Sequence, residues 1–384
     1  MRRYDPADEE RIRSRSLVRE WTRSGLLAAA QMAHLEAGLR VDLRRTNLFL
    51  RLVLFLFALL IVAASVLLII TFSGTKDDEN IAILTAIASL ACLGLAEYLI
   101  ARFRLYRFGV EEGFAVAAVA LLTVSAVFMA SRVRNGRPGE SQVLAGLIVA
   151  APCAFAIYRR FGYIYAALAA IVCAALIPFH TSLSPEMQRT AAAGILVLVF
   201  ATARAKHLLH GDEFPGDEYG MIQAAAWAGL YFNLNLQISF GRIGGWFYWS
   251  TYALIWLLPI IGLRMALRDR DRLLLDVNLA MALVTIATNK SYLDLPRQPW
   301  DPILFGVFLM AAAITIRRWL LKGPEGERYG FRPLPLLTAE RRALAVVSAA
   351  SAIVQPDIPA APAAPTKPEL GGGRSGGGGA SGSF

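Results

Sequence analysis

The feature that most constrains this chain is a series of apolar blocks about 20 residues long, separated by short charged segments. An α-helix rises about 1.5 Å per residue, so about 20 apolar residues cross the ~30 Å hydrocarbon core of a bilayer. We place the blocks at residues 48–72, 80–101, 108–130, 142–158, 161–180, 190–205, 219–240, 246–264, 273–289 and 302–320. The sequence therefore predicts an all-α, polytopic membrane protein with about ten transmembrane helices.

The composition agrees with this fold class and excludes several others. Hydrophobic residues make up 56% of the chain and charged residues 18%, whereas soluble domains average about 45–50% and about 25%. A soluble globular enzyme, a disordered protein and a disulfide-rich secreted module are excluded. The three cysteines, Cys92, Cys153 and Cys173, all lie inside apolar blocks, as small buried hydrophobic residues do.

The basic residues predict which side of the membrane each loop faces. With the N-terminus cytoplasmic, 30 of the 39 Lys and Arg residues fall on that side and 8 on the other, while Arg51 lies inside the first span. This is the positive-inside pattern, and it places the C-terminus in the cytoplasm as well. Only the loop with Arg132, Arg134 and Arg137 disagrees.

The net charge of +10 is therefore interpreted as a topology signal and an attraction for anionic lipid, with no nucleic-acid partner. High Ala and Arg content with little Lys is typical of a bacterial protein of high genomic GC. We expect a multi-pass protein of the bacterial inner (plasma) membrane.

The chain divides into four predicted regions. Residues 1–47 form a basic cytoplasmic helical hairpin with a break at Ser24 and Gly25, and residues 48–321 form the transmembrane domain. Residues 322–354 form a cytoplasmic segment with a short interfacial helix, which Thr338 can cap. Residues 355–384, rich in Pro and Ala and then in Gly and Ser, are predicted to be disordered.

Carboxylates near the cytoplasmic ends of two spans are candidate functional groups, because charge is costly at membrane depth. They are Glu97 in the second block and Glu111 and Glu112 in the third. One interpretation is a cluster of interfacial ion pairs with the arginines of the intervening loop, Arg102, Arg104 and Arg107. The other is a proton or cation relay at a cytoplasmic mouth.

Amides and a carboxylate in the seventh and ninth blocks are the second set of candidates. Asn233, Asn235 and Gln237 alternate along the chain, so either the helix ends near Phe232 or the side chains point in several directions. They indicate a plain outer turn or the lining of a cavity.

Asp276 lies four residues after Arg272 in the ninth block, within reach of an ion pair. Asn278 follows it and suits a polar contact between helices. The alternative for both Asp276 and Asn278 is a polar site that faces an internal cavity.

Residue patterns for catalysis are absent. The sequence has no phosphate loop, dinucleotide fingerprint or nucleophile elbow. His207 and His210, with Asp212 and Glu213 nearby, suit a solvated loop better than a metal site. We expect no enzyme activity, no catalytic, cofactor-binding or metal-binding residues, and no cofactor.

Near the N-terminus, Leu17, Trp21, Gly25 and Leu26 are followed by Gln31 and Leu35 and then by the first span. This order resembles the start of uncharacterised bacterial predicted-membrane-protein families, in which a small Trp/Gly helical hairpin precedes many spans. The resemblance covers about the first 50 residues. It implies an architecture, and it implies no activity, because those families have no assigned function.

Two functions from different classes follow. The first is transport of a small solute, with polar residues of the seventh and ninth spans lining the path. The second is a non-transporting membrane scaffold or sensor that acts through its N-terminal hairpin and its tail. The partners expected are the lipid bilayer, anionic lipid, and a cytosolic or membrane protein docked on the hairpin.

Overall fold

The computed structural model describes residues 3–23, 27–74, 77–131, 139–210, 218–238, 243–296, 298–323 and 328. Within them the fold is all-α. Its helices are α1 Pro6–Arg23, α2 Ala29–Gly38, α3 Leu48–Ser73, α4 Asp78–Phe103, α5 Val110–Ala130, α6 Glu140–Phe161, α7 Ile164–Leu176, α8 Pro185–His210, α9 Glu218–Leu234, α10 Gly245–Asp269, α11 Arg272–Tyr292 and α12 Asp301–Leu321. A 3₁₀ turn, η1 (Ile177–His180), follows α7 directly.

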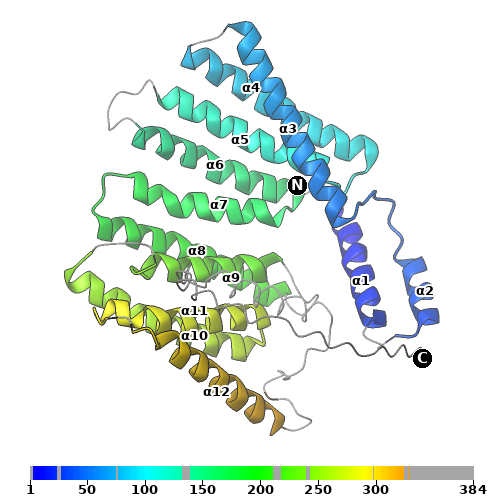
Figure 1. Ribbon diagram of the computed structural model, residues 1–384. Helices are drawn as coiled ribbons and strands as arrows, with labels where there is room; N and C mark the ends of the chain where they lie inside the picture. Colours follow the sequence, from blue (N-terminus) through cyan, green and yellow to red (C-terminus); the bar gives the residue numbers. More distant parts are fainter. Residues whose placement is uncertain are drawn as a thin grey trace, which may run out of the picture.

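Helices α4 to α8 lie in rows that follow chain order, and α11 lies between α9 and α10, with α3 crossing at one edge and α12 at the other (Figure 1). We call α3–α12 the helix stack. Successive helices run in opposite directions, so the connections alternate between the two ends of the stack. The hairpin α1–α2 lies beside one end, which we call the hairpin end, and α12 finishes at that end too (Figure 1).

Local signals explain where the helices begin and end. The Asn47 side chain accepts a hydrogen bond from the Leu50 backbone N–H (2.7 Å) and caps α3, and Asp271 caps α11 in the same way at Leu274 (3.1 Å). These oxygens satisfy backbone donors that have no partner within the helix. Gly74 and Gly162, both with positive φ, end α3 and α6, as glycine commonly does.

Small residues bring α3, α4 and α5 together. The Ser89 and Ser125 hydroxyls of α4 and α5 donate to the Ala118 and Ala82 carbonyls across the interface, at 2.6 and 2.8 Å. A β-carbon at Gly113 of α5 would lie 2.9 Å from the Phe55 carbonyl oxygen of α3. Close backbone approach through small residues is a usual way for helices to associate in a bilayer.

The contact between α10 and α11 is equally close. Asn278 of α11 is fully buried, and its amide lies directly over Gly262 of α10. A β-carbon at Gly262 would be 1.9 Å from the Asn278 Oδ1 atom. Leu258, Ala266, Leu274 and other residues of α8–α11 form the apolar core around this contact.

The structure confirms the all-α fold class, and each of the ten predicted blocks corresponds to one helix of the stack. Eight of the described helices are at least 18 residues long and apolar enough to cross a membrane: α3, α4, α5, α6, α8, α10, α11 and α12. The other two, α9 and α7 with its 3₁₀ extension, are shorter. The predicted helical hairpin is present as α1 and α2.

Three predicted blocks have the wrong extent. Block 190–205 is too short, because α8 runs from Pro185 to His210. Block 219–240 is helical only to Leu234, because Asn235 begins a turn there. Block 161–180 starts its helix at Ile164, after a turn at Gly162, and finishes as a 3₁₀ turn at Pro178. The predicted interfacial helix within 322–354 and the predicted disordered tail at 355–384 fall almost entirely outside the described residues.

Gly262→Ala tests the packing of α10 on α11. The new methyl group overlaps the Asn278 amide, so we expect a loss of about 1–3 kcal/mol of stability, measured as a lower thermal unfolding midpoint in detergent. Gly306→Ala in α12 is the matched control, since nothing lies within 4 Å of a β-carbon there. Equal midpoints for both variants and the parent protein would contradict this packing.

Candidate functional site

The hairpin end of α5 holds the carboxylates Glu111 and Glu112, both buried. Arg51 of α3 donates to Glu112 through Nε (2.7 Å) and through a terminal nitrogen (2.5 Å), a two-pronged ion pair. Gly109, with φ of +113°, precedes α5, and a β-carbon there would lie 2.3 Å from the Arg51 carbonyl oxygen. Glycine at this position therefore lets α3 come close enough for the ion pair.

Glu111 has no such cation. Its Oε1 atom accepts a hydrogen bond from the Phe108 backbone N–H at 2.6 Å. Its Oε2 atom is buried with no hydrogen-bond partner among the described residues. Phe108 precedes α5, so the Glu111 side chain reaches back over the start of its own helix, as the carboxylate of a capping box does.

The first residues of the chain dock on this same end. Tyr4 is buried, its ring meets Tyr106 edge to face at 4.9 Å, and its hydroxyl lies 3.5 Å from the Tyr163 hydroxyl. Burial raises the pKa of the Tyr4 phenol well above its ordinary value, so the hydroxyl stays protonated. Arg13 of α1 adds an ion pair to Glu218 of α9 at 3.3 Å.

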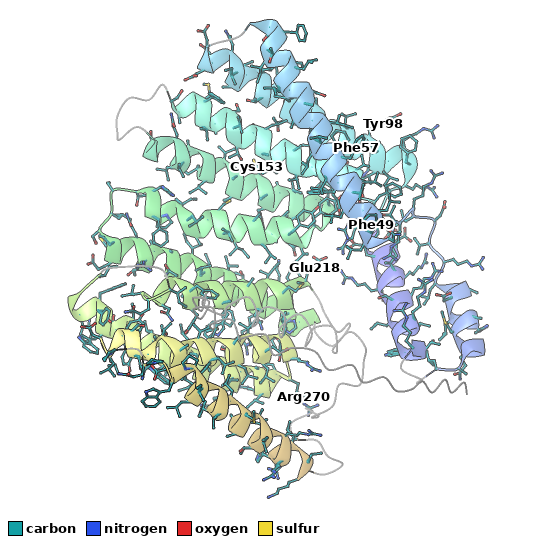
Figure 2. All side chains as sticks on the ribbon, in the orientation of Figure 1. Phe49, Phe57, Tyr98, Cys153, Glu218 and Arg270 are labelled. Atoms are coloured by element: carbon teal, nitrogen blue, oxygen red, sulfur yellow. The ribbon has the colours of Figure 1, made fainter. Side chains whose placement is uncertain are left out.

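The hairpin itself is closed by an ion pair between its two helices. Arg19 of α1 donates to Glu36 of α2 at 2.5 Å, with Arg15 at 3.3 Å. The hydrogen bond from Arg19 lowers the pKa of the Glu36 carboxyl. Figure 2 shows Phe49, Glu218 and Arg270 toward the same end of the stack.

Glu97 connects the hairpin to the helix stack. It accepts from Arg160 of α6 at 2.5 Å and forms an ion pair with Arg3 at 3.4 Å. The Arg3 backbone N–H also donates to the Arg160 carbonyl at 2.8 Å. The interpretation of Glu97 as part of an interfacial ion-pair cluster is thus supported, but its partners are Arg160 and Arg3 rather than the arginines of the next loop.

A groove of about 1150 Å³ opens beside Glu97, between α6 and α8, with α7 behind it. Apolar residues such as Phe155, Ala170 and Val199 form most of its wall. Its end nearest the hairpin is charged and is lined by Glu97, Arg159, Arg160 and Lys206. An apolar groove with a basic end matches the chemistry of an amphiphile with an acidic head.

The amides of the seventh and ninth predicted blocks take part in helix–helix hydrogen bonds. Trp227 donates to the Asn278 amide oxygen at 2.8 Å, and the Asn278 amide nitrogen donates to the Leu274 carbonyl at 2.7 Å. Asn235 donates to the Tyr231 hydroxyl at 3.1 Å and to Thr288 at 3.2 Å. These contacts join α9 to α11.

Asn233 and Asp276 lie apart from that network. Asn233 exchanges two hydrogen bonds with Arg189 of α8. The Asn233 side-chain amide donates to the Arg189 backbone carbonyl at 2.9 Å, and the Arg189 guanidinium donates to the Asn233 backbone carbonyl at 2.6 Å. Asp276 is half-buried on α11. Neither these two residues nor Asn235 and Asn278 line the groove.

The seven predicted site residues therefore do not form one site. Glu97, Glu111 and Glu112 lie at the hairpin end, whereas Asn233 and Asn235 lie at the opposite end of α9. Sequence reasoning missed Arg160 and Arg3, the partners of Glu97, because the contact joins residues 63 positions apart. The available signal in the sequence was the pair Arg159 and Arg160, which follows the fourth predicted block.

A polar cluster beyond the predicted set joins α8, α9 and the α10–α11 turn. Asp271 accepts from Gln223 at 3.0 Å and lies 3.5 Å from the His207 ring nitrogen, while Arg204 pairs with Asp269. Among the described residues, no three His, Cys, Asp or Glu side chains are grouped as a metal site requires. The prediction of a solvated loop for His207 and His210 is wrong, because both belong to α8. Asp212 and Glu213 lie outside the described residues.

No protein-family model matches the sequence, and no similar curated protein or solved structure was found. The resemblance of the N-terminal hairpin to uncharacterised membrane-protein families therefore stays a prediction.

The Arg51–Glu112 ion pair can be tested by a double-mutant cycle. Arg51→Met leaves the buried Glu112 carboxylate without its cation, and we expect a loss of about 3 kcal/mol. Arg51→Met with Glu112→Met removes both charges, and much of that stability should return. Unfolding midpoints in detergent measure the cycle, and purely additive losses would show that the two side chains do not interact.

Proposed function

We propose that this protein is a non-transporting membrane sensor of the bacterial inner membrane, with ten spans and a cytoplasmic hairpin end. Alternation of the ten stack helices supports this count, and the excess of basic residues in the loops at the hairpin end supports this orientation. The shorter helices α7 and α9 are counted as spans, because the chain must cross the membrane between the helix before and the helix after each of them.

The position of Glu97 is the observation that carries the proposal. This one carboxylate lines the groove and pairs with Arg160, which lines it too, and also with Arg3 of the N-terminal segment. A ligand in the groove and the hairpin therefore share a charged group. Their binding equilibria are linked through it, which is the basis of coupling between two sites.

The ion pairs of Glu97 are weak enough for one ligand to change them. The Arg160, Arg3 and Glu97 side chains are 42%, 32% and 28% exposed, and partly exposed ion pairs are worth about 1 kcal/mol or less each. An anionic head in the groove attracts Arg160 and weakens its hold on Glu97. The hairpin contact then changes at an energy cost that one ligand can supply.

Transport of a small solute is the competing hypothesis, and the interior of α9–α11 gives it less support. Asn235, Asn278 and Thr285 are at most 1% exposed and are hydrogen-bonded to side chains or backbone of these helices. Polar groups already paired in this way stabilise helix packing, whereas a transport path needs groups that are free to meet a solute.

Cysteine accessibility separates the two hypotheses without a known substrate. In a variant with Cys92, Cys153 and Cys173 replaced by Ala, a sensor predicts no labelling of Asn235→Cys or Thr285→Cys by a membrane-impermeant maleimide. Ser182→Cys, in an exposed loop, is the positive control and should label fully. Labelling of both helix positions in folded, monodisperse protein would instead support a water-filled transport path.

Coupling is tested by hydrogen exchange of α1 in nanodiscs. Exchange should be slower in discs containing phosphatidylglycerol than in phosphatidylcholine alone, because the anionic head draws Arg160 away and leaves Glu97 to pair more strongly with Arg3. Glu97→Gln should remove this lipid dependence, as should Ala156→Trp, which fills the groove at an exposed wall position.

Glu79→Gln, at the far end of α4, is the matched control and should keep the lipid response. A wild-type protein whose α1 exchange is identical in both lipids would contradict the sensor proposal.

A further inference from the structure

A second cavity, of about 270 Å³, lies where α1 meets the start of α3 and the α4–α5 loop. Four arginines line it: Arg13, Arg45, Arg51 and Arg107. It is separate from the groove, because the two linings have no residue in common. Four guanidinium groups around a space this small repel one another and attract negative charge.

The protein supplies only part of that charge among its described residues. Arg51 is neutralised by Glu112, and Arg13 by Glu218. Arg45 and Arg107 have no carboxylate partner within the described part of the chain. Their guanidinium carbons instead lie over the one ring of Tyr106, at 5.8 and 5.5 Å from its centroid. Arg107 also donates to the Gly162 carbonyl at 3.5 Å, and Arg45 is exposed, so both cations face the same ring without a described carboxylate partner.

The walls of this arginine cavity are held in place. The Arg44 backbone N–H donates to the Arg104 carbonyl at 2.9 Å, and the Tyr106 N–H donates to the Arg44 carbonyl at 3.0 Å. The Thr46 hydroxyl donates to the Phe108 carbonyl at 3.1 Å. These bonds join the linker before α3 to the α4–α5 loop, so the cavity is formed before any ligand arrives.

Backbone conformation and charge repulsion both act on these two arginines. Arg107 has a φ of +50°, a left-handed conformation that side chains other than glycine rarely adopt. Burial and the neighbouring charge of Arg107 lower the pKa of Arg45. An arginine stays protonated in proteins, so a bound anion would relieve this repulsion.

We propose that this cavity binds a phosphate group. Planar guanidinium groups pair with phosphate through two parallel hydrogen bonds, and a phosphate monoester carries a charge of about −1.5 to −2 at neutral pH. That charge matches the two arginines that have no carboxylate partner among the described residues. The group belongs to a lipid head or to a soluble phosphate compound, and the exposed Leu48 at the cavity edge, where α3 enters the membrane, favours the lipid.

Binding is measured on the full-length protein in detergent with three lipids and one salt. Phosphatidic acid offers a monoester, phosphatidylglycerol a diester and phosphatidylcholine no net charge, while inorganic phosphate is the soluble probe. We expect the lowest Kd for phosphatidic acid, or for inorganic phosphate if the natural ligand is soluble. Arg45→Gln and Arg107→Gln should each raise that Kd about tenfold.

Arg102→Gln and Arg40→Gln are matched controls, because both arginines are exposed at the hairpin end outside the cavity, and their Kd should stay within about twofold of wild type. Arg45→Lys guards against misfolding, since it keeps the charge and should lose less affinity than Arg45→Gln.

Equal losses in cavity and control variants would mean a general basic surface and would overturn the proposal, as would the absence of binding by all four probes. Ala156→Trp and Glu97→Gln should leave this affinity unchanged, so failure of the groove proposal and failure of this one are distinguishable.

Discussion

Helices in a bilayer gain no hydrophobic free energy from packing against each other, because lipid tails are as apolar as their side chains. This structure depends instead on close backbone approach and on polar groups that satisfy one another. Gly113 lets α3 reach the α5 backbone, and Gly262 makes room for the Asn278 amide. With a methyl group at either position, the helices would separate and leave a buried polar group without its partner, at a cost that membranes make large.

That constraint explains why most of the polar residues in the spans are structural. Asn278 and Thr285 each bond both within α11 and to a neighbouring helix. The charged groups at the hairpin end obey a different rule, because water and lipid headgroups are available to them there. Glu97 can exchange partners at little cost, whereas Asn278 cannot. In the proposed sensor, regulation lies at the ends of the helices and rigidity inside them.

The sequence predicted the helices well because each apolar block carries its own signal. Long blocks such as 48–72 match their helices closely, while 219–240 was too long because Asn235 interrupts the helix in an apolar surrounding. The site was harder to predict. Glu97 was identified as a costly charge, but its partner Arg160 is set by which helices become neighbours, and no local pattern of residues encodes that contact.

The arginine cavity is a second feature that the sequence did not predict. The positive-inside pattern accounts for many arginines near the hairpin end, and it is indifferent to whether each one has a partner. Only the structure shows which arginines have a carboxylate partner. Arg15 and Arg19 form ion pairs with Glu36, and Arg104 forms one with Asp42. Arg45 and Arg107 have no such carboxylate among the described residues, as is also true of the exposed Arg40 and Arg102, but they alone of these four lie over the Tyr106 ring. A topology signal would be satisfied by arginines spread over the surface. It gives no reason for two of them to converge on one buried tyrosine ring, and the phosphate proposal supplies one.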